Sequence, residues 1–276
     1  EEFKRLGVLG DWDNPYLTMN YEYQAGILAE LGKVHAKGLL YKGKKPVHWC
    51  ASCKTALAEA EVEYADKTSP SVYVKFEVKD AKGKFAVNPV KGTFFVIWTT
   101  TPWTLPANLA IAVHPKAMYR HVKTIYGELI MEQSLIKPCM EKFAIKEDDY
   151  EILEHAMAGQ ELEGIVCKHP FIERESKIVL GEHVTTDTGT GCVHIAPGHG
   201  QDDYEIGLKY GLDIYAPVDN AGKFTSEFKE FEGRPVFSAN QGIIELLKSK
   251  DALLKEEKIS HSYPHCWRCK NPIIFR

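Results

Sequence analysis

The sequence lacks any apolar run that approaches the roughly 18 residues of a membrane-spanning helix. The charged opening Glu1–Arg5 fits neither a secretory signal nor a transit sequence, so we expect these residues not to be a targeting segment. These absences argue against a membrane partner, and we expect the chain to work in the cytoplasm. Its 44% hydrophobic and 26% charged residues are typical of a globular protein with one large domain or two smaller ones.

An excess of positive charge is missing too. Lys and Arg number 34 against 38 Asp and Glu, a formal net charge of −4. Proteins that grip nucleic acid broadly carry a basic stripe that releases counterions from phosphates. The composition therefore argues against a broad nucleic-acid contact and is compatible with a narrow or tethered one at the end of a strand.

The usual signs of an activated nucleophile are also absent. There is no G-x-S-x-G elbow and no evident Cys-His pair, so any hydrolysis would use a positioned water. The chain has no initiator Met, and its last residues, Ile273–Arg276, look like an unfinished strand. We expect a piece of a longer polypeptide.

The seven cysteines include two C-x-x-C pairs, Cys50 with Cys53 and Cys266 with Cys269. Two such knuckles can supply four thiolates to one tetrahedral zinc ion. In a compact zinc ribbon the knuckles lie roughly 15 to 20 residues apart, whereas here nearly the whole chain intervenes. If the knuckles meet, the intervening chain is a domain inserted on a two-legged stalk. Disulfides are the alternative, which a reducing compartment disfavours.

Hydrophobic periodicity predicts more strands than helices. The predicted helices are residues 21–37, 134–143, 202–210 and 240–249. The predicted strands are residues 72–78, 93–98, 110–113, 121–124, 129–131, 150–153, 177–180 and 192–195. Because strands and helices do not alternate regularly, we expect an α+β fold, a β-barrel-like domain with peripheral helices, rather than a doubly wound sheet.

A threonine-rich segment, Trp98–Asn108, follows one predicted strand. It gathers hydroxyl and carboxamide groups on a loop that two prolines stiffen. Clustered neutral hydrogen-bonding groups suit a ligand with many oxygens, such as a ribose or an ester. The alternative is that the threonines merely finish a strand. The candidate ligand-binding residues here are Thr99, Thr100, Thr101, Thr104 and Asn108.

A second segment, Gly189–Tyr204, is rich in glycine and histidine. Its glycines let the backbone approach a ligand closely, and Gly198-His199-Gly200 leads into a predicted helix. We expect Asp202 to cap this helix and Asp203 to lie in its first turn, ionised and able to hold a cation such as an α-ammonium group.

Two other interpretations of this segment stay open. Asp202 and Asp203 could both act only as capping residues at the start of the helix, without binding a ligand. A metal hydrolase using His194, His199, Asp202 and Asp203 is disfavoured, because H-x-x-x-x-H on a Gly/Pro loop is not a helical metal motif. We therefore expect no catalytic metal.

These two segments, in this order, resemble the inserted editing domain (CP1) of the class I aminoacyl-tRNA synthetases for isoleucine, valine and leucine. The run Thr99–Thr104 is similar to the isoleucine branch, since the other two branches typically carry T-T-R-P there. The resemblance extends to Gly10-Asp11-Trp12 and to His261–Arg268, and so covers essentially the whole chain.

The resemblance implies a division of the chain. Residues 1–45 would adjoin the catalytic body, residues 46–70 and 259–276 would form a two-stranded zinc-ribbon stalk, and residues 71–258 would be the editing domain. The signatures H-I-G-H and K-M-S-K-S are absent, so ATP-dependent activation would belong to the parent enzyme. Some members lack the four cysteines, which implies a structural zinc.

The resemblance also implies an activity, the hydrolysis of valine from mischarged tRNA(Ile). A hydrophobic pocket gains little from one extra methylene group, and the standard example is isoleucine against valine, which such a pocket separates by only about 150-fold. A second site must therefore remove the smaller product. Asp203 would bind the α-ammonium group, and His194 would help exclude isoleucine's extra methyl. The other implied site residues are Thr99, Thr100, Thr101 and Asn108 around adenosine, ester and water, and Trp103, Thr104, Gly198 and His199 around the substrate.

Two alternatives remain: editing by a valyl or leucyl relative, and a non-hydrolytic, zinc-stapled tRNA-binding module. The expected partners are the valine-bearing 3′ end of tRNA(Ile) and the rest of the synthetase in cis. A monomer is expected.

Overall fold

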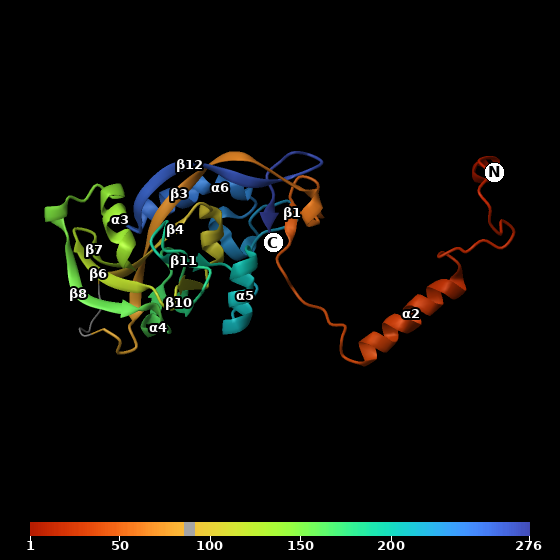
Figure 1. The fold of residues 1–276 in the computed structure, drawn as a ribbon. Coiled ribbons are helices and arrows are strands. Elements are labelled where there is room, and N and C mark those ends of the chain that lie inside the picture. Colours follow the sequence, from red (N-terminus) through yellow and green to blue (C-terminus); the bar gives the residue numbers. More distant parts are fainter. Residues whose placement is uncertain (86–91) are drawn as a thin grey trace. The chain divides into compact units, whose positions relative to one another are not determined.

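The computed structural model describes residues 1–85 and 92–276, which form two compact units, Glu1–Lys44 and Lys45–Arg276 (Figure 1). The first unit holds α1 (Glu2–Arg5) and α2 (Tyr21–Ala36), and neither helix has a buried residue. The helix predicted over residues 21–37 is thereby confirmed. Among the described residues, no helix combines the length and the apolar character needed to cross a membrane.

The second unit is built on a large mixed sheet with the strand order β11-β5-β10-β9-β3-β4-β7-β6-β8, and β12 pairs with β3. The β10–β5 and β4–β7 pairs are parallel, and the other pairs are antiparallel. Its strands are β3 (Val62–Asp80), β4 (Thr93–Thr99), β5 (Ala110–Val113), β6 (Met118–Thr124), β7 (Gly127–Glu132), β8 (Glu151–Ala158), β9 (Val166–Lys168), β10 (Glu175–Leu180), β11 (Cys192–Ile195) and β12 (Leu253–Cys266). Every predicted strand overlaps one of these.

The prediction of an α+β fold is confirmed, but the barrel needs correction. In the part of the chain that the structure describes, the end strands β11 and β8 do not pair with each other, so the sheet stays open. Periodicity shows which residues form strands, whereas closure depends on tilt and stagger between strands far apart in sequence.

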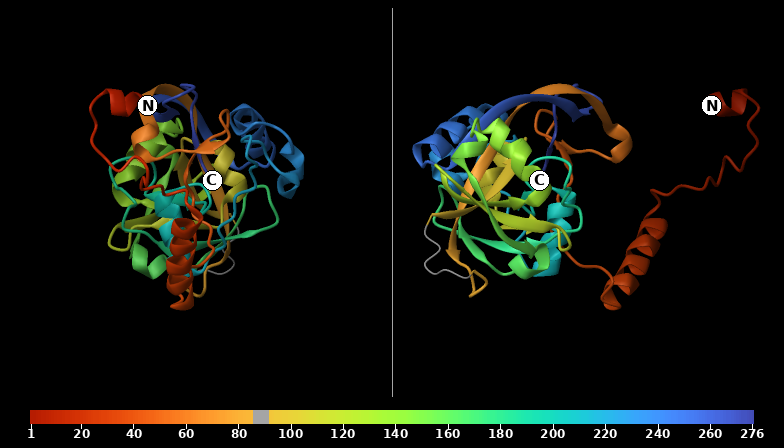
Figure 2. Two further views of the ribbon diagram at one scale, coloured as in Figure 1. Left: turned by 90° about the vertical axis from the view of Figure 1, so that its right-hand side faces the viewer. Right: turned by 60° about the vertical axis from the view of Figure 1, so that its left-hand side comes forward.

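A long ribbon of β3 and β12 extends from this sheet. Its ladder runs from Val62 opposite Cys266 to Val74 opposite Leu253, and Figure 2 shows the two strands arching side by side. At its end lies a small sheet in the order β13-β1-β2, with strands β1 (His48–Cys50), β2 (Thr55–Ala56) and β13 (Ile274–Phe275). The ribbon therefore carries both knuckles.

Helices cover the large sheet. The main core joins α6 to β3 and β4, and a second cluster packs α3 against β6 and β7. Alternation along β3 serves both, because Val72 and Val74 enter the main core while Tyr73 enters the second. The helices are α3 (Ile136–Lys142), α4 (Gly159–Leu162), α5 (Gln201–Tyr210) and α6 (Val236–Ser249), with 3-10 turns η1 (Glu59–Glu61), η2 (Pro102–Ala107), η3 (Gln133–Leu135), η4 (Glu147–Asp149) and η5 (Ser226–Phe231).

Candidate functional site

A cavity of about 400 Å³ brings most of the predicted site together. Its walls come from three stretches of sequence: the threonine-rich segment, the β11–α5 segment, and the end of the ribbon with the last residues of the chain. The lining residues are Trp98, Thr99, Thr101, Trp103, Thr104, Val193, His194, His199, Gly200, Asp203, His261, Ser262, Tyr263, Pro264, Ile273, Ile274 and Phe275.

The threonine-rich segment is held by its own hydrogen bonds. The Thr101 amide donates to Thr99 Oγ1 over 3.1 Å, and Thr104 Oγ1 donates to the Thr101 carbonyl over 2.8 Å. The turn η2 is buried along its whole length, and the Trp103 amide donates to Asn240 Oδ1 of α6 over 3.0 Å. The segment thus forms a rigid wall rather than a mobile loop.

His194 is a neutral imidazole in this cavity. Its Nε2 lies 3.0 Å from Thr104 Oγ1, whose single proton already goes to the Thr101 carbonyl, so Nε2 carries the hydrogen and donates. Burial lowers the pKa of His194 to about 4. Its Nδ1 is buried and has no hydrogen-bond partner among the described residues. His194 therefore offers an acceptor without positive charge.

Asp203 lies in the first turn of α5, as predicted, with its side chain half-buried. Its carboxylate accepts the Ala196 amide over 2.8 Å. Desolvation raises the pKa of Asp203 to about 7, and the neighbouring Asp202 carboxylate adds to the rise. The expectation of a fully ionised Asp203 therefore needs correction, because burial outweighs the favourable helix start.

The expected cap of α5 was also wrong. Gly200 is the N-cap residue, no side chain among the described residues caps the helix, and Asp202 lies exposed inside the first turn. The helix begins one residue before the predicted start.

His199 links this segment to the end of the chain. Its Nδ1 donates to the Phe275 carbonyl over 2.9 Å, and its ring stands edge-on to Trp103 with the centroids 4.9 Å apart. Burial lowers the pKa of His199 to about 4. The residues that close this side, His261–Pro264 and Ile273–Phe275, were not predicted as site residues, because no local pattern marks them.

Three predicted residues lie outside this cavity. Asn108 is fully buried, where Nδ2 donates to the Ala110 carbonyl over 2.8 Å and Oδ1 accepts from Ser176 Oγ. Gly198 is pressed against the backbone, since a Cβ there would come within 2.3 Å of the Tyr215 oxygen. Thr100 lines a smaller neighbouring cavity.

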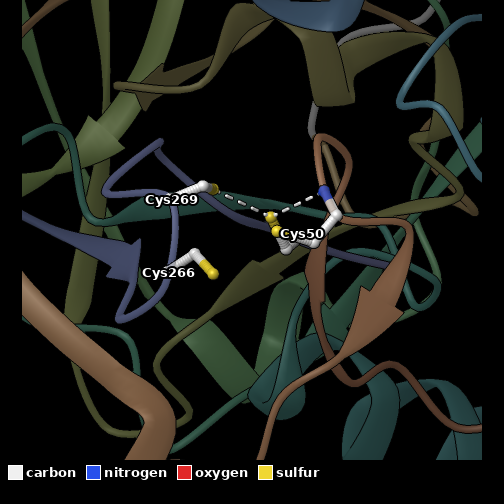
Figure 3. Close-up of side chains that lie close together, drawn as sticks. Cys50, Cys266 and Cys269 are labelled. Carbon is white, nitrogen blue, oxygen red and sulfur yellow. Dashed lines mark hydrogen bonds between the residues drawn. The ribbon is translucent and has the colours of Figure 1, made fainter.

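The four paired cysteines converge at the end of the ribbon. Their sulfur atoms all lie within 4.8 Å of one another, and the Cys50 and Cys269 sulfurs are 3.5 Å apart (Figure 3). A tetrahedral zinc with bonds of about 2.3 Å needs sulfurs roughly 3.8 Å apart, so the donor set fits zinc. The residues after the knuckles, Lys54 and Lys270, have φ of 52° and 59°, so both turns share a left-handed step.

Comparison with known proteins identifies relatives along the whole chain. The family model described as tRNA synthetases class I (I, L, M and V) matches residues 1–265. The isoleucine–tRNA ligases of Desulfitobacterium hafniense and Desulforamulus reducens are 53% and 54% identical to all of this chain. The chain spans 29% of the length of each.

Solved structures also resemble the chain. GlLeuRS-CP1 superposes with a TM-score of 0.50 at 15% identity, over 68% of this chain and 99% of that one, which supports a common fold. The cytosolic leucyl-tRNA synthetase editing domain of P. knowlesi has a TM-score of 0.49 at 13% identity, over 67% of this chain and 96% of that one.

Proposed function

The chain belongs to the class I tRNA synthetases of the isoleucine, leucine, methionine and valine group, and on this basis we propose that it edits mischarged tRNA(Ile) by hydrolysing the valyl ester. The observation that carries the proposal is the single cavity lined by Asp203, Thr99, Thr101 and His194. An aminoacyl ester requires three features of its binding site: an anion for the amino group, hydroxyls for the ester and a neutral wall for the side chain.

The proposed roles begin with Asp203, which binds the α-ammonium group. Its raised pKa favours this role, because a bound cation restores the ionised form that burial disfavours. Thr99 and Thr101 hold the ribose and the ester carbonyl beside a water. The water oxygen attacks the carbonyl carbon and gives up a proton, the bond to the ribose oxygen breaks, and that oxygen takes up the proton. The ester is already activated, so orientation and electrostatic stabilisation of the oxyanion supply the rate.

The proposed selectivity comes from the hydrogen-bonded pair His194 and Thr104. Both side chains are buried, at 7% and 5% exposure. They cannot move aside for a larger substrate side chain without breaking the hydrogen bond between His194 Nε2 and Thr104 Oγ1. Isoleucine's extra methyl is thereby excluded, whereas valine fits. Trp103, packed against His199 and Phe237, supports the same wall.

The remaining assignments follow the family. We assign residues 1–45 to the parent's catalytic body, residues 46–70 and 259–276 to a zinc-bearing stalk, and residues 71–258 to the editing domain. The four cysteines would hold a structural zinc. The protein would act in the cytoplasm on the 3′ end of tRNA(Ile), with the rest of the synthetase in cis, which alone uses ATP.

The test is the release of labelled amino acid from Val-tRNA(Ile) and Ile-tRNA(Ile). We expect faster release of valine, and a loss of at least about 100-fold in Asp203→Ala, because ester and water lose their alignment. Glu205→Ala is the matched control, since that exposed carboxylate lies on the same helix but outside the cavity. Equal activity in wild type and Asp203→Ala would remove Asp203 from the mechanism, and binding without turnover would favour the tRNA-binding module.

A further inference from the structure

Lys67 lies between two aromatic rings and has no acidic partner in the part of the chain that the structure describes. It lies in β3, and its Nζ stands 3.7 Å from the ring centroid of Phe237 and 4.2 Å from that of Tyr263. None of the ion pairs among residues 1–85 and 92–276 includes it. Burial lowers the pKa of Lys67 to about 8. A half-buried ammonium that rests against ring faces and takes part in no ion pair of the described residues can still gain from an anion.

This ammonium faces a second cavity, of about 140 Å³. Hydroxyls of Thr68 and Thr100 and the amide of Asn240 also line it, and Asn240 Oδ1 is taken by the Trp103 amide, which leaves its NH2 group as a donor. The residue next to Lys67, Asp66, is exposed, and strand alternation directs it to the other face of the ribbon. The small cavity thus presents one cation and several neutral donors.

The two cavities share the residues Thr101, Trp103 and Tyr263. The Lys67 cavity therefore lies directly beside the cavity proposed to hold the ester. We propose that the Lys67 cavity binds a backbone phosphate of the RNA 3′ end, next to the nucleotide that carries the amino acid. This inference rests on the proposed editing function for the position of the ester. It accounts for a tRNA contact in a chain of net charge −4, because one localised cation replaces a basic stripe.

The experiment measures binding of a trinucleotide with the sequence CCA to the zinc-loaded chain, with adenosine and inorganic phosphate as further probes. Loss of a charged hydrogen bond predicts about ten- to hundredfold weaker trinucleotide binding in Lys67→Met. The slope of log K against log salt should fall by about 0.7, the value for one single-strand phosphate. Adenosine binding should not change. Lys67→Arg should retain the slope, and Lys258→Met, which removes an exposed lysine of β12 outside both cavities, should match wild type.

Each outcome decides between the two proposals. Trinucleotide binding that needs Lys67, without hydrolysis of Val-tRNA(Ile), would retain the phosphate site and reject the editing function. If Val-tRNA(Ile) is hydrolysed but Lys67→Met leaves the trinucleotide affinity and the salt slope unchanged, the editing function is retained and the phosphate site is rejected. Inorganic phosphate that binds as tightly as the trinucleotide would overturn the RNA assignment. If Lys67→Met fails to fold, the 13Cε resonance of Lys67 in wild type decides, since it should move with the trinucleotide and stay fixed with adenosine.

Discussion

His199 donates its Nδ1 hydrogen to the carbonyl of Phe275, 2.9 Å away, and so joins the loop before α5 to the end of the chain. Phe275 lies in β13, which pairs with the first knuckle strand β1. Cys269, a ligand of the predicted zinc site, is only a few residues earlier. The cavity wall and the cysteine cluster therefore belong to one connected structure, and a structural change in one should alter the other.

Zinc removal should weaken both stability and deacylation. Four thiolates without an ion lose the bonds that hold the two knuckles together, and the wall formed by Ile273–Phe275 loses its support. We expect one zinc per chain by elemental analysis, and after chelation a lower melting temperature and slower release of valine. Restored zinc should reverse both effects. A chelated chain that melts and deacylates like the holoprotein would contradict the link.

Asp203 should make stability depend on pH. Its pKa rises from 3.8 in the unfolded chain to about 7 in the fold, so the unfolded state holds fewer protons between these values. The free energy of unfolding should therefore fall as pH increases from about 4 to about 7, by about 2 kcal/mol from this group after allowance for its solvent contact. Urea titrations of wild type and Asp203→Asn at a series of pH values measure this change in the free energy of unfolding. A difference between the two proteins that does not vary with pH would contradict the buried carboxylate.

Thr104→Val should relax selectivity. The substitution keeps the shape but leaves His194 Nε2 without its partner, which costs about 1 to 3 kcal/mol of stability. The wall can then move, so the ratio of valine to isoleucine release from tRNA(Ile) should fall. Thr124→Val is the control, because that hydroxyl closes a turn outside the cavity with the Gly127 carbonyl, and its loss should leave the ratio unchanged.

Asn108→Ala should act on stability rather than on substrate binding. The change leaves Ser176 Oγ and the Ala110 carbonyl without their partner in the interior, so we expect a loss of about 1 to 3 kcal/mol in denaturant unfolding. The KM for Val-tRNA(Ile) should stay near that of wild type. A raised KM with unchanged stability would return Asn108 to the substrate site.

The sequence alone was enough to predict the local elements and the cysteine cluster, and it proposed the residue types of the candidate site. Alternation marked residues 72–78, the helical period marked residues 21–37, and the C-x-x-C pairs predicted the cysteine cluster. Each of these patterns depends on residues close together in the chain, which is why it can be recognised without a structure.

Only the tertiary structure decided what each site residue experiences. Strand pairing of Tyr263 with Ala65 and of Phe275 with His48 places both aromatic residues against the threonine-rich segment, and burial turns Asp203 into a carboxylate with a raised pKa. The same packing moves Asn108 into the interior and leaves Lys67 between two rings. Desolvation and contact depend on neighbours that are distant in sequence, so no local pattern could reveal them.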